Sequence, residues 1–191
     1  MAAKTVERLT ARERLLAAAD ELFYKEGVHT VGIDRVIAHA GVAKASLYNT
    51  FGSKDELVRA YLQRRQQTRQ ERIQARLTTL DTPRERLLGV FDVLADVFAQ
   101  PGYRGCAFQN ASAEGPDDGT VSSVCDDIRG WTRTLFIDLA REAGAADPEG
   151  LARRLVLLYD GATVSARMDK DLEAAVVARA VAGMLLDAAG V

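Results

Sequence analysis

The stretch IDRVIAHAGVAKASLYNTF, residues 33–51, decides how the N-terminal part of the chain is interpreted. Its apolar residues recur at helical spacing up to Ala40 and again from Val42 to Phe51. Gly41 lies between the two halves, where a residue without a Cβ lets the backbone turn sharply. Two short helices joined by such a turn form a helix-turn-helix, whose second helix can lie in a DNA major groove. The stretch therefore predicts a DNA-reading motif, with an ordinary pair of bundle helices as the alternative.

The second helix of this motif has one apolar and one polar side. Leu47 and Phe51 share the side that can dock inward. The other residues are small, polar or singly charged, as a helix needs for close approach and for hydrogen bonds to base edges. These residues are Lys44, Ala45, Ser46, Tyr48, Asn49 and Thr50.

The sequence around the motif resembles the DNA-binding domain of the TetR family of transcriptional regulators over residues 10–62. The matching positions are Phe23, Gly27, Ala40-Gly41-Val42, Lys44, Leu47-Tyr48, Phe51, Ser53-Lys54 and Leu57. The resemblance implies an all-α fold of about nine helices. A three-helix helix-turn-helix domain over 1–54 would precede a ligand-binding and dimerisation domain over 55–191, with a helix from about 54 to 80 as the connector.

The resemblance also implies a function and its partners. The chain would be a DNA-binding transcriptional regulator, in most cases a repressor that a small-molecule ligand releases from a palindromic operator. Its partners would be a double-stranded DNA operator, an unidentified effector and a second copy bound through the eighth and ninth helices. The alternative is a helical ligand-binding or interaction protein without operator-specific DNA binding.

Matching the family motif residue by residue assigns the DNA contacts. Lys44, Ala45 and Ser46 begin the reading helix, nearest the base edges. Lys44 can donate to guanine O6 and N7, and Ala45 fits against a thymine methyl. The contacts expected at phosphates come from Tyr48, Thr50 and Lys54, and Asn49 is expected to contact either base or phosphate.

The start of the preceding helix departs from the family pattern. Gly32 stands where many such sequences carry Ser or Thr, so it can cap the helix only through its backbone. Thr30 is expected to take over part of the phosphate contact. Asp34 is expected to face solvent at the helix N-terminus, and acceptance of a hydrogen bond from a cytosine amine is the alternative.

Two apolar faces near the C-terminus predict a dimer surface, and the monomer's own core is the alternative. One face comprises Leu151, Leu155, Leu158, Tyr159 and Ala162, and the other Val176, Val177, Ala180, Val181, Met184 and Leu185. A largely apolar ligand pocket is expected among the fourth to eighth helices, although aromatic residues at helical spacing are also typical of plain core. Its expected lining is Phe91, Leu94, Phe98, Cys106, Phe108, Asn110, Trp131 and Tyr159.

The charges are divided unequally along the chain. Residues 1–80 carry 14 Lys and Arg against 9 Asp and Glu, and residues 81–191 carry 11 against 18. The first part can therefore face phosphates, whereas the acidic second part should stay off DNA. The connecting helix contributes an arginine run that is expected to form a solvated face, and general electrostatic attraction to DNA is the further interpretation. The run comprises Arg64, Arg65, Arg69, Arg72 and Arg76.

Several functions find no support in the sequence. It lacks GxSxG, a phosphate-binding glycine loop and HExxH, so an enzyme is not expected. Cys106 and Cys125 are expected to be reduced core residues, with a redox switch as the alternative, and no zinc site or cofactor is predicted. No apolar run is long enough for a membrane span and the start of the chain lacks a signal-peptide core, so a cytoplasmic protein is expected. Residues 1–9 should be a loose arm and 116–119 a loop.

Overall fold

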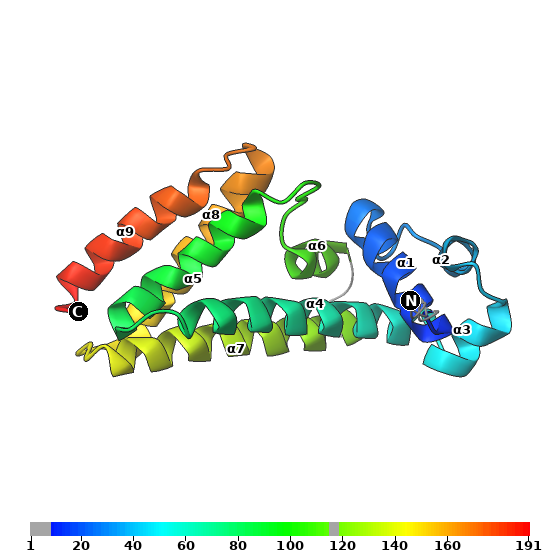
Figure 1. Ribbon diagram of the computed structural model, residues 1–191, viewed down its shortest axis with the longest axis horizontal. Helices are drawn as coiled ribbons and strands as arrows, with labels where there is room; N and C mark the ends of the chain where they lie inside the picture. Colours follow the sequence, from blue (N-terminus) through cyan, green and yellow to red (C-terminus); the bar gives the residue numbers. More distant parts are fainter. Residues whose placement is uncertain (1–8, 115–118) are drawn as a thin grey trace, which may run out of the picture. The chain divides into compact units, whose positions relative to one another are not determined.

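The computed structural model describes residues 9–114 and 119–191, so most of the expected arm and loop lie outside the described residues. Over those ranges the protein is all-helical with nine helices, as expected (Figure 1). They are α1 Ala11–Glu26, α2 Ile33–Ala40, α3 Lys44–Phe51, α4 Lys54–Leu77, α5 Pro83–Phe98, α6 Ala107–Glu114, α7 Thr120–Glu142, α8 Pro148–Met168 and α9 Ala174–Ala188. None of the described helices is long and apolar enough to cross a membrane.

Local capping chemistry explains where several helices begin and end. Thr10 and Glu13 form a capping box at the start of α1, and Thr82 and Glu85 form another at the start of α5. The Asp147 carboxylate caps α8 by accepting from the Gly150 amide at 2.9 Å. At the other end of α4 the hydroxyls of two threonines, at 78 and 79, donate to carbonyls of the last turn. The helix ends at Leu77, short of the expected residue 80, and i→i−3 backbone hydrogen bonds continue the turn to Leu80.

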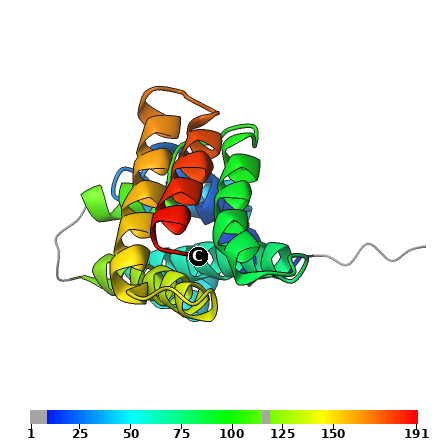
Figure 2. The ribbon, with the colours of Figure 1, turned by 90° about the vertical axis from the view of Figure 1, so that its left-hand side faces the viewer.

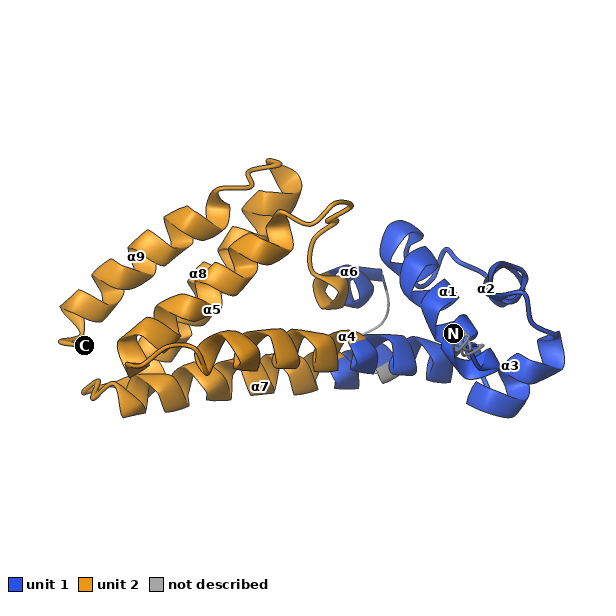
Figure 3. Ribbon diagram, viewed as in Figure 1, with its two compact units in different colours: residues 1–64, 110–124 blue, residues 65–109, 125–191 orange. Residues whose placement is uncertain are grey.

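The chain divides into two compact units (Figure 3). The first comprises Met1–Arg64 and Asn110–Val124, and within it α1 packs against both α2 and α3. Leu15, Val36 and Leu47 are completely buried there. The rings of Phe23 and Tyr61 meet edge to face, with 5.6 Å between their centres. These apolar contacts hold the short helices α2 and α3, which could not be stable alone.

The end of α6 is tied to the loop between α1 and α2 within this first unit. The Glu114 carboxylate accepts a hydrogen bond from the His29 amide at 3.0 Å. Gly27 has a φ of 101°, and a Cβ placed there would lie only 2.7–2.9 Å from the same carboxylate group. The positive φ favours glycine at 27, and a larger residue would also require the end of the Glu114 side chain to shift.

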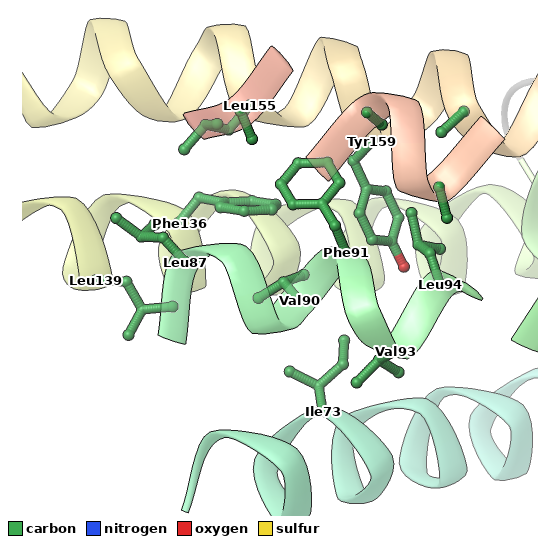
Figure 4. Packing of buried hydrophobic residues seen from close by; sticks show 14 of the residues in the cluster. Ile73, Leu87, Val90, Phe91, Val93, Leu94, Phe136, Leu139, Leu155 and Tyr159 are labelled. Atoms are coloured by element: carbon green, nitrogen blue, oxygen red, sulfur yellow. The ribbon is translucent and has the colours of Figure 1, made fainter. Parts of the chain in front are cut away.

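The second unit, Arg65–Gln109 and Cys125–Val191, contains a larger hydrophobic core. Its α9 packs against α5 and α8, as the end-on view in Figure 2 also shows. Three aromatic rings form its centre, those of Phe91, Phe136 and Tyr159, with 6.0–6.3 Å between ring centres (Figure 4). Ile73 and Leu77 extend the core from the last turns of α4.

Two apolar stripes remain exposed on the neighbouring helices α8 and α9. On α8 the exposed residues are Leu157, Val164 and Met168, and Leu157 and Met168 are about three-quarters exposed, at 75% and 74%. On α9 they include Val177, Val181 and Met184, the last being 68% exposed. The residues named lie seven and four positions apart on α8 and four and three apart on α9, so each stripe runs along one side of its helix.

The face expected on α8 for dimerisation is therefore wrong, whereas the one expected on α9 is exposed. Leu151, Leu155, Tyr159 and Ala162 are buried in the unit's own core. The exposed residue Leu157 lies on the other side of the same helix. Because α8 is apolar on two sides, helical spacing alone does not distinguish the side that faces the core.

Candidate nucleic-acid interface

The helix-turn-helix is formed by α2, the turn at Gly41 and α3. Gly41 has φ 62° and ψ 40°, the left-handed conformation that glycine adopts without a Cβ penalty. Its amide donates to carbonyls of the last turn of α2, and the chain re-enters a helix at Lys44. Val36, Ile37 and Leu47 are buried between the helices. The apolar pattern thus fixes which side of α3 remains available.

The polar side of α3 is open to solvent over its whole length. Leu47 is 0% exposed, whereas Tyr48 next to it is 45% exposed. Four other residues of α3 that are expected to contact DNA are also exposed: Lys44, Ala45, Asn49 and Thr50. Ser46 is partly exposed. The Thr50 hydroxyl donates to the Ser46 carbonyl at 2.6 Å, which fixes its rotamer.

Lys44 and Asp34 form an ion pair between α3 and α2. The Lys44 ammonium donates to the Asp34 carboxylate at 2.9 Å, and both side chains are more than half exposed. The hydrogen bond with Asp34 raises the pKa of Lys44 above its ordinary value, and the opposite charge adds to this effect. Asp34 is thus exposed, as expected, but it is also engaged with the residue predicted to read a base.

Some of the positions expected at phosphates lie at or just before helix starts. Thr30 and Gly32 are exposed just before α2, and Gly32 is its N-cap, without a side-chain capping bond. The N-terminus of a helix favours an anion through its free amides and its dipole. Lys54 begins α4 and donates to the His29 carbonyl at 3.5 Å, a weak contact, and no acid in ranges 9–114 and 119–191 pairs with its charge.

The residues expected to line a ligand pocket fall into different surroundings. Phe91, Leu94 and Phe98 are buried in the core of the second unit. Phe108 and Tyr159 are also buried, while Trp131 and Cys106 are partly exposed. Asn110 belongs to the first unit and is partly exposed. Of these residues, the structure brings Phe91 and Tyr159 into direct ring contact.

Both cysteines are free thiols. Cys125 is buried, and its thiol donates to the Phe108 carbonyl at 3.5 Å. Burial raises the pKa of Cys125 to about 11, with smaller contributions from Cys106 and Asp126. The Cys125 thiol therefore stays protonated and unreactive near neutral pH. No group of three His, Cys, Asp or Glu side chains in the described residues could hold a metal ion.

Arg69 departs from the expectation for the arginine run of α4. Its Nε is closed to solvent and has no hydrogen-bond partner in the described part of the chain. Its guanidinium lies over the rings of Tyr159 and Phe108, at 5.0 and 5.9 Å from their centres. The spacing could have revealed this position, because Arg69 lies seven residues after Leu62 and four before Ile73, on the buried stripe of the helix.

Comparison with known proteins relates this architecture to a family. Residues 15–61 match the model described as bacterial regulatory proteins, tetR family. The solved structure of SCO4454, a TetR-family transcriptional regulator from Streptomyces coelicolor, is 32% identical with a TM-score of 0.89. That match covers 95% of this chain and 96% of SCO4454.

Two relatives of named regulatory type are also similar. The transcriptional activator FasR from Mycolicibacterium smegmatis is 32% identical over 135 residues, which cover 70% of this chain but only 60% of FasR. The transcriptional repressor NemR from Escherichia coli is 27% identical over 172 residues, which cover 85% of this chain and 86% of NemR. The similarity therefore extends both to a transcriptional activator and to a transcriptional repressor of the helix-turn-helix type.

Proposed function

Because this chain belongs to the TetR family of bacterial helix-turn-helix transcriptional regulators, we propose that it binds a palindromic DNA operator as a homodimer and is released by a small-molecule ligand. The family is one of regulators and not of enzymes. We assign DNA binding to residues 1–54 and ligand binding and dimerisation to 55–191. A regulator of this kind must share a compartment with DNA, which supports a cytoplasmic location.

The observation that carries the DNA-binding proposal is the division of α3 into a buried and an exposed side. Leu47 anchors the helix, and the side that remains exposed carries a lysine, small residues and hydrogen-bonding groups. Such a surface suits the major groove, where base edges present donors, acceptors and a methyl group. The alternative, a ligand-binding protein without operator recognition, gives no reason for this side to remain polar and uncovered.

The exposed stripes of α8 and α9 support the homodimer. Leu157, Met168 and Met184 each expose two-thirds or more of their surface in the single chain. A second copy that packs the same stripes against these would bury them all through one two-fold interface. Two reading heads would then meet two half-sites about one helical turn, or a multiple of it, apart.

We favour repression over activation as the regulatory effect of this protein. The similarity to the repressor NemR extends over most of both chains, whereas the similarity to the activator FasR covers 60% of FasR. Release by a ligand requires that the ligand bind better to the conformation that does not fit the operator. Selection of bound sequences from random DNA, followed by mobility shifts, tests operator binding directly, and failure to enrich a palindrome would favour the alternative function.

Lys44→Ala should cost about 1–3 kcal/mol of binding free energy per half-site and relax the preference at one base pair. The reason is the loss of a bidentate donor to a base edge. Fluorescence anisotropy on the selected operator and on single-base variants measures both effects. Lys25→Ala, which removes the same charge from the exposed end of α1, is the control. Equal losses on every base variant would contradict a base contact.

Lys54→Ala should instead weaken binding to all sequences alike. A phosphate contact carries no sequence information. Without this contact, binding of the protein to DNA releases one counterion fewer per protomer. The slope of log K against log salt should therefore fall by about one per protomer, or about two for a dimer. A salt titration of operator and random DNA measures it, and an unchanged slope would show that Lys54 does not reach a phosphate.

A further inference from the structure

Arg69 is a cation at a core position of the second unit. The other residues of its helical stripe, Ile73 and Leu77, are buried and join the hydrophobic core. The side chain of Arg69 is itself partly buried, and its Nε is closed to solvent. An arginine keeps its charge in proteins, so the position cannot become neutral by losing a proton.

Among the described residues, no carboxylate forms an ion pair with this charge. The guanidinium lies over the faces of Tyr159 and Phe108, it is hydrogen-bonded to the Tyr159 side chain, and Asp160 attracts it without direct contact. Asp160, which follows Tyr159, is already bound to the Arg129 guanidinium at 2.9 Å. Burial raises the pKa of the Tyr159 hydroxyl, although Arg69 acts in the opposite direction, so the phenol stays neutral near pH 7.

A cation that is bound to one neutral hydroxyl and two ring faces, with its Nε left without a hydrogen bond, has donors to spare for an anion. Charged groups taken from water must recover hydrogen bonds and an opposite charge, and a cation over aromatic rings recovers only part of this. The guanidinium presents its donors in a planar fork that matches a carboxylate with two parallel hydrogen bonds. The aromatic rings beside it would surround an apolar body next to that carboxylate.

We infer that Arg69 is the anchor of the regulatory ligand and that this ligand is an organic monocarboxylate with an apolar body, held between Arg69, Phe108 and Tyr159. This inference rests on the proposed function, because it names the chemical class of the ligand of the second unit. It also differs from the pocket expected from the sequence, whose lining contains no charged side chain.

The test uses the full chain and pairs of simple probes. Butanoate, octanoate, benzoate and naphthoate are each compared with the alcohol of the same carbon skeleton, by calorimetric titration. Wild type should bind at least one acid, and about tenfold or more tighter than its alcohol. Arg69→Met should lose that preference, while Arg72→Met, the same change at an exposed position of the same helix, should keep it.

Three results would overturn the inference: no acid binds wild type, acids and alcohols bind alike, or Arg69→Met binds acids as wild type does. Thermal unfolding of unliganded Arg69→Met checks that the variant folds, because the change also removes the hydrogen bond to the buried Tyr159 side chain. If it fails to fold, Arg69→Lys decides. This variant keeps the charge without the fork, so it should weaken the acid more than the alcohol, and equal affinities would overturn the assignment.

Operator binding, measured in parallel, separates this inference from the proposed function. Wild type and Arg69→Met should bind the selected operator alike without a probe, and the acid should release only wild type. Acid binding without release would overturn ligand-controlled regulation and leave the anion site intact. Release of Arg69→Met by the same acid would overturn the anion site and leave the regulation intact.

Discussion

Glutamate in place of Met184 should convert the protein into a 20.7 kDa monomer at micromolar concentration and weaken operator binding by about 10²–10⁴-fold. Met184 is 68% exposed and lies on the apolar stripe of α9 that we assign to the dimer. In a two-fold interface each substitution appears twice, so two unpaired carboxylates would have to be buried. A monomer engages its half-sites one at a time and loses the gain from tethering two reading heads.

Light scattering and sedimentation measure the mass, and anisotropy measures binding to the full operator and to one half-site. Thr134→Glu adds the same charge at an exposed position of α7 and should leave both the mass and the affinity unchanged. Binding of Met184→Glu to an isolated half-site should also equal that of wild type. A Met184→Glu protein that remains dimeric would exclude the α9 stripe as the interface.

Phe91→Ala should lower the free energy of unfolding by about 3–5 kcal/mol. Phe91 is 0% exposed, and its ring contacts those of Phe136 and Tyr159 at the centre of the second unit (Figure 4). Truncation removes the transfer free energy of the ring and leaves a cavity that rigid neighbours on α7 and α8 fill only in part.

Denaturant unfolding at one fixed protein concentration measures the loss, because dimerisation makes stability depend on concentration. Asp96→Ala, at an exposed position of the same helix, should stay within about 0.5 kcal/mol of wild type. Equal unfolding midpoints for the two variants would mean that Phe91 does not lie at the centre of a closely packed core.

Local signals in the sequence predicted the elements well. A capping box is formed by two residues three positions apart, such as Thr10 and Glu13, so it can be predicted directly from their spacing. Gly41 and the apolar spacing around it located both helices of the reading motif. The ends of helices were less predictable, because at the end of α4 the backbone changes from α-helical to i→i−3 hydrogen bonds without a sequence signal such as Gly or Pro at that point.

The sequence could not show which of two similar surfaces faces inward, nor which charges meet across helices. Leu155 and Leu157 are the same residue type two positions apart, yet one is buried and the other exposed. Their environments depend on the packing of α9 and α5, which helical spacing does not encode. Lys44 and Asp34 are ten residues apart on different helices, so their ion pair follows from the crossing of α2 and α3 and not from a pattern.

The hydrogen bond from the His29 amide to Glu114 makes one backbone proton a reporter on the end of α6. Helix α6 starts in the second unit at Ala107 and ends in the first, at the carboxylate that holds this proton. While the bond is intact, the proton should exchange slowly with deuterium from the solvent; when α6 withdraws, it should exchange at the rate of a free loop. Deuterium uptake at the His29 amide would therefore report how often the Glu114 carboxylate leaves it, without any label or added chromophore.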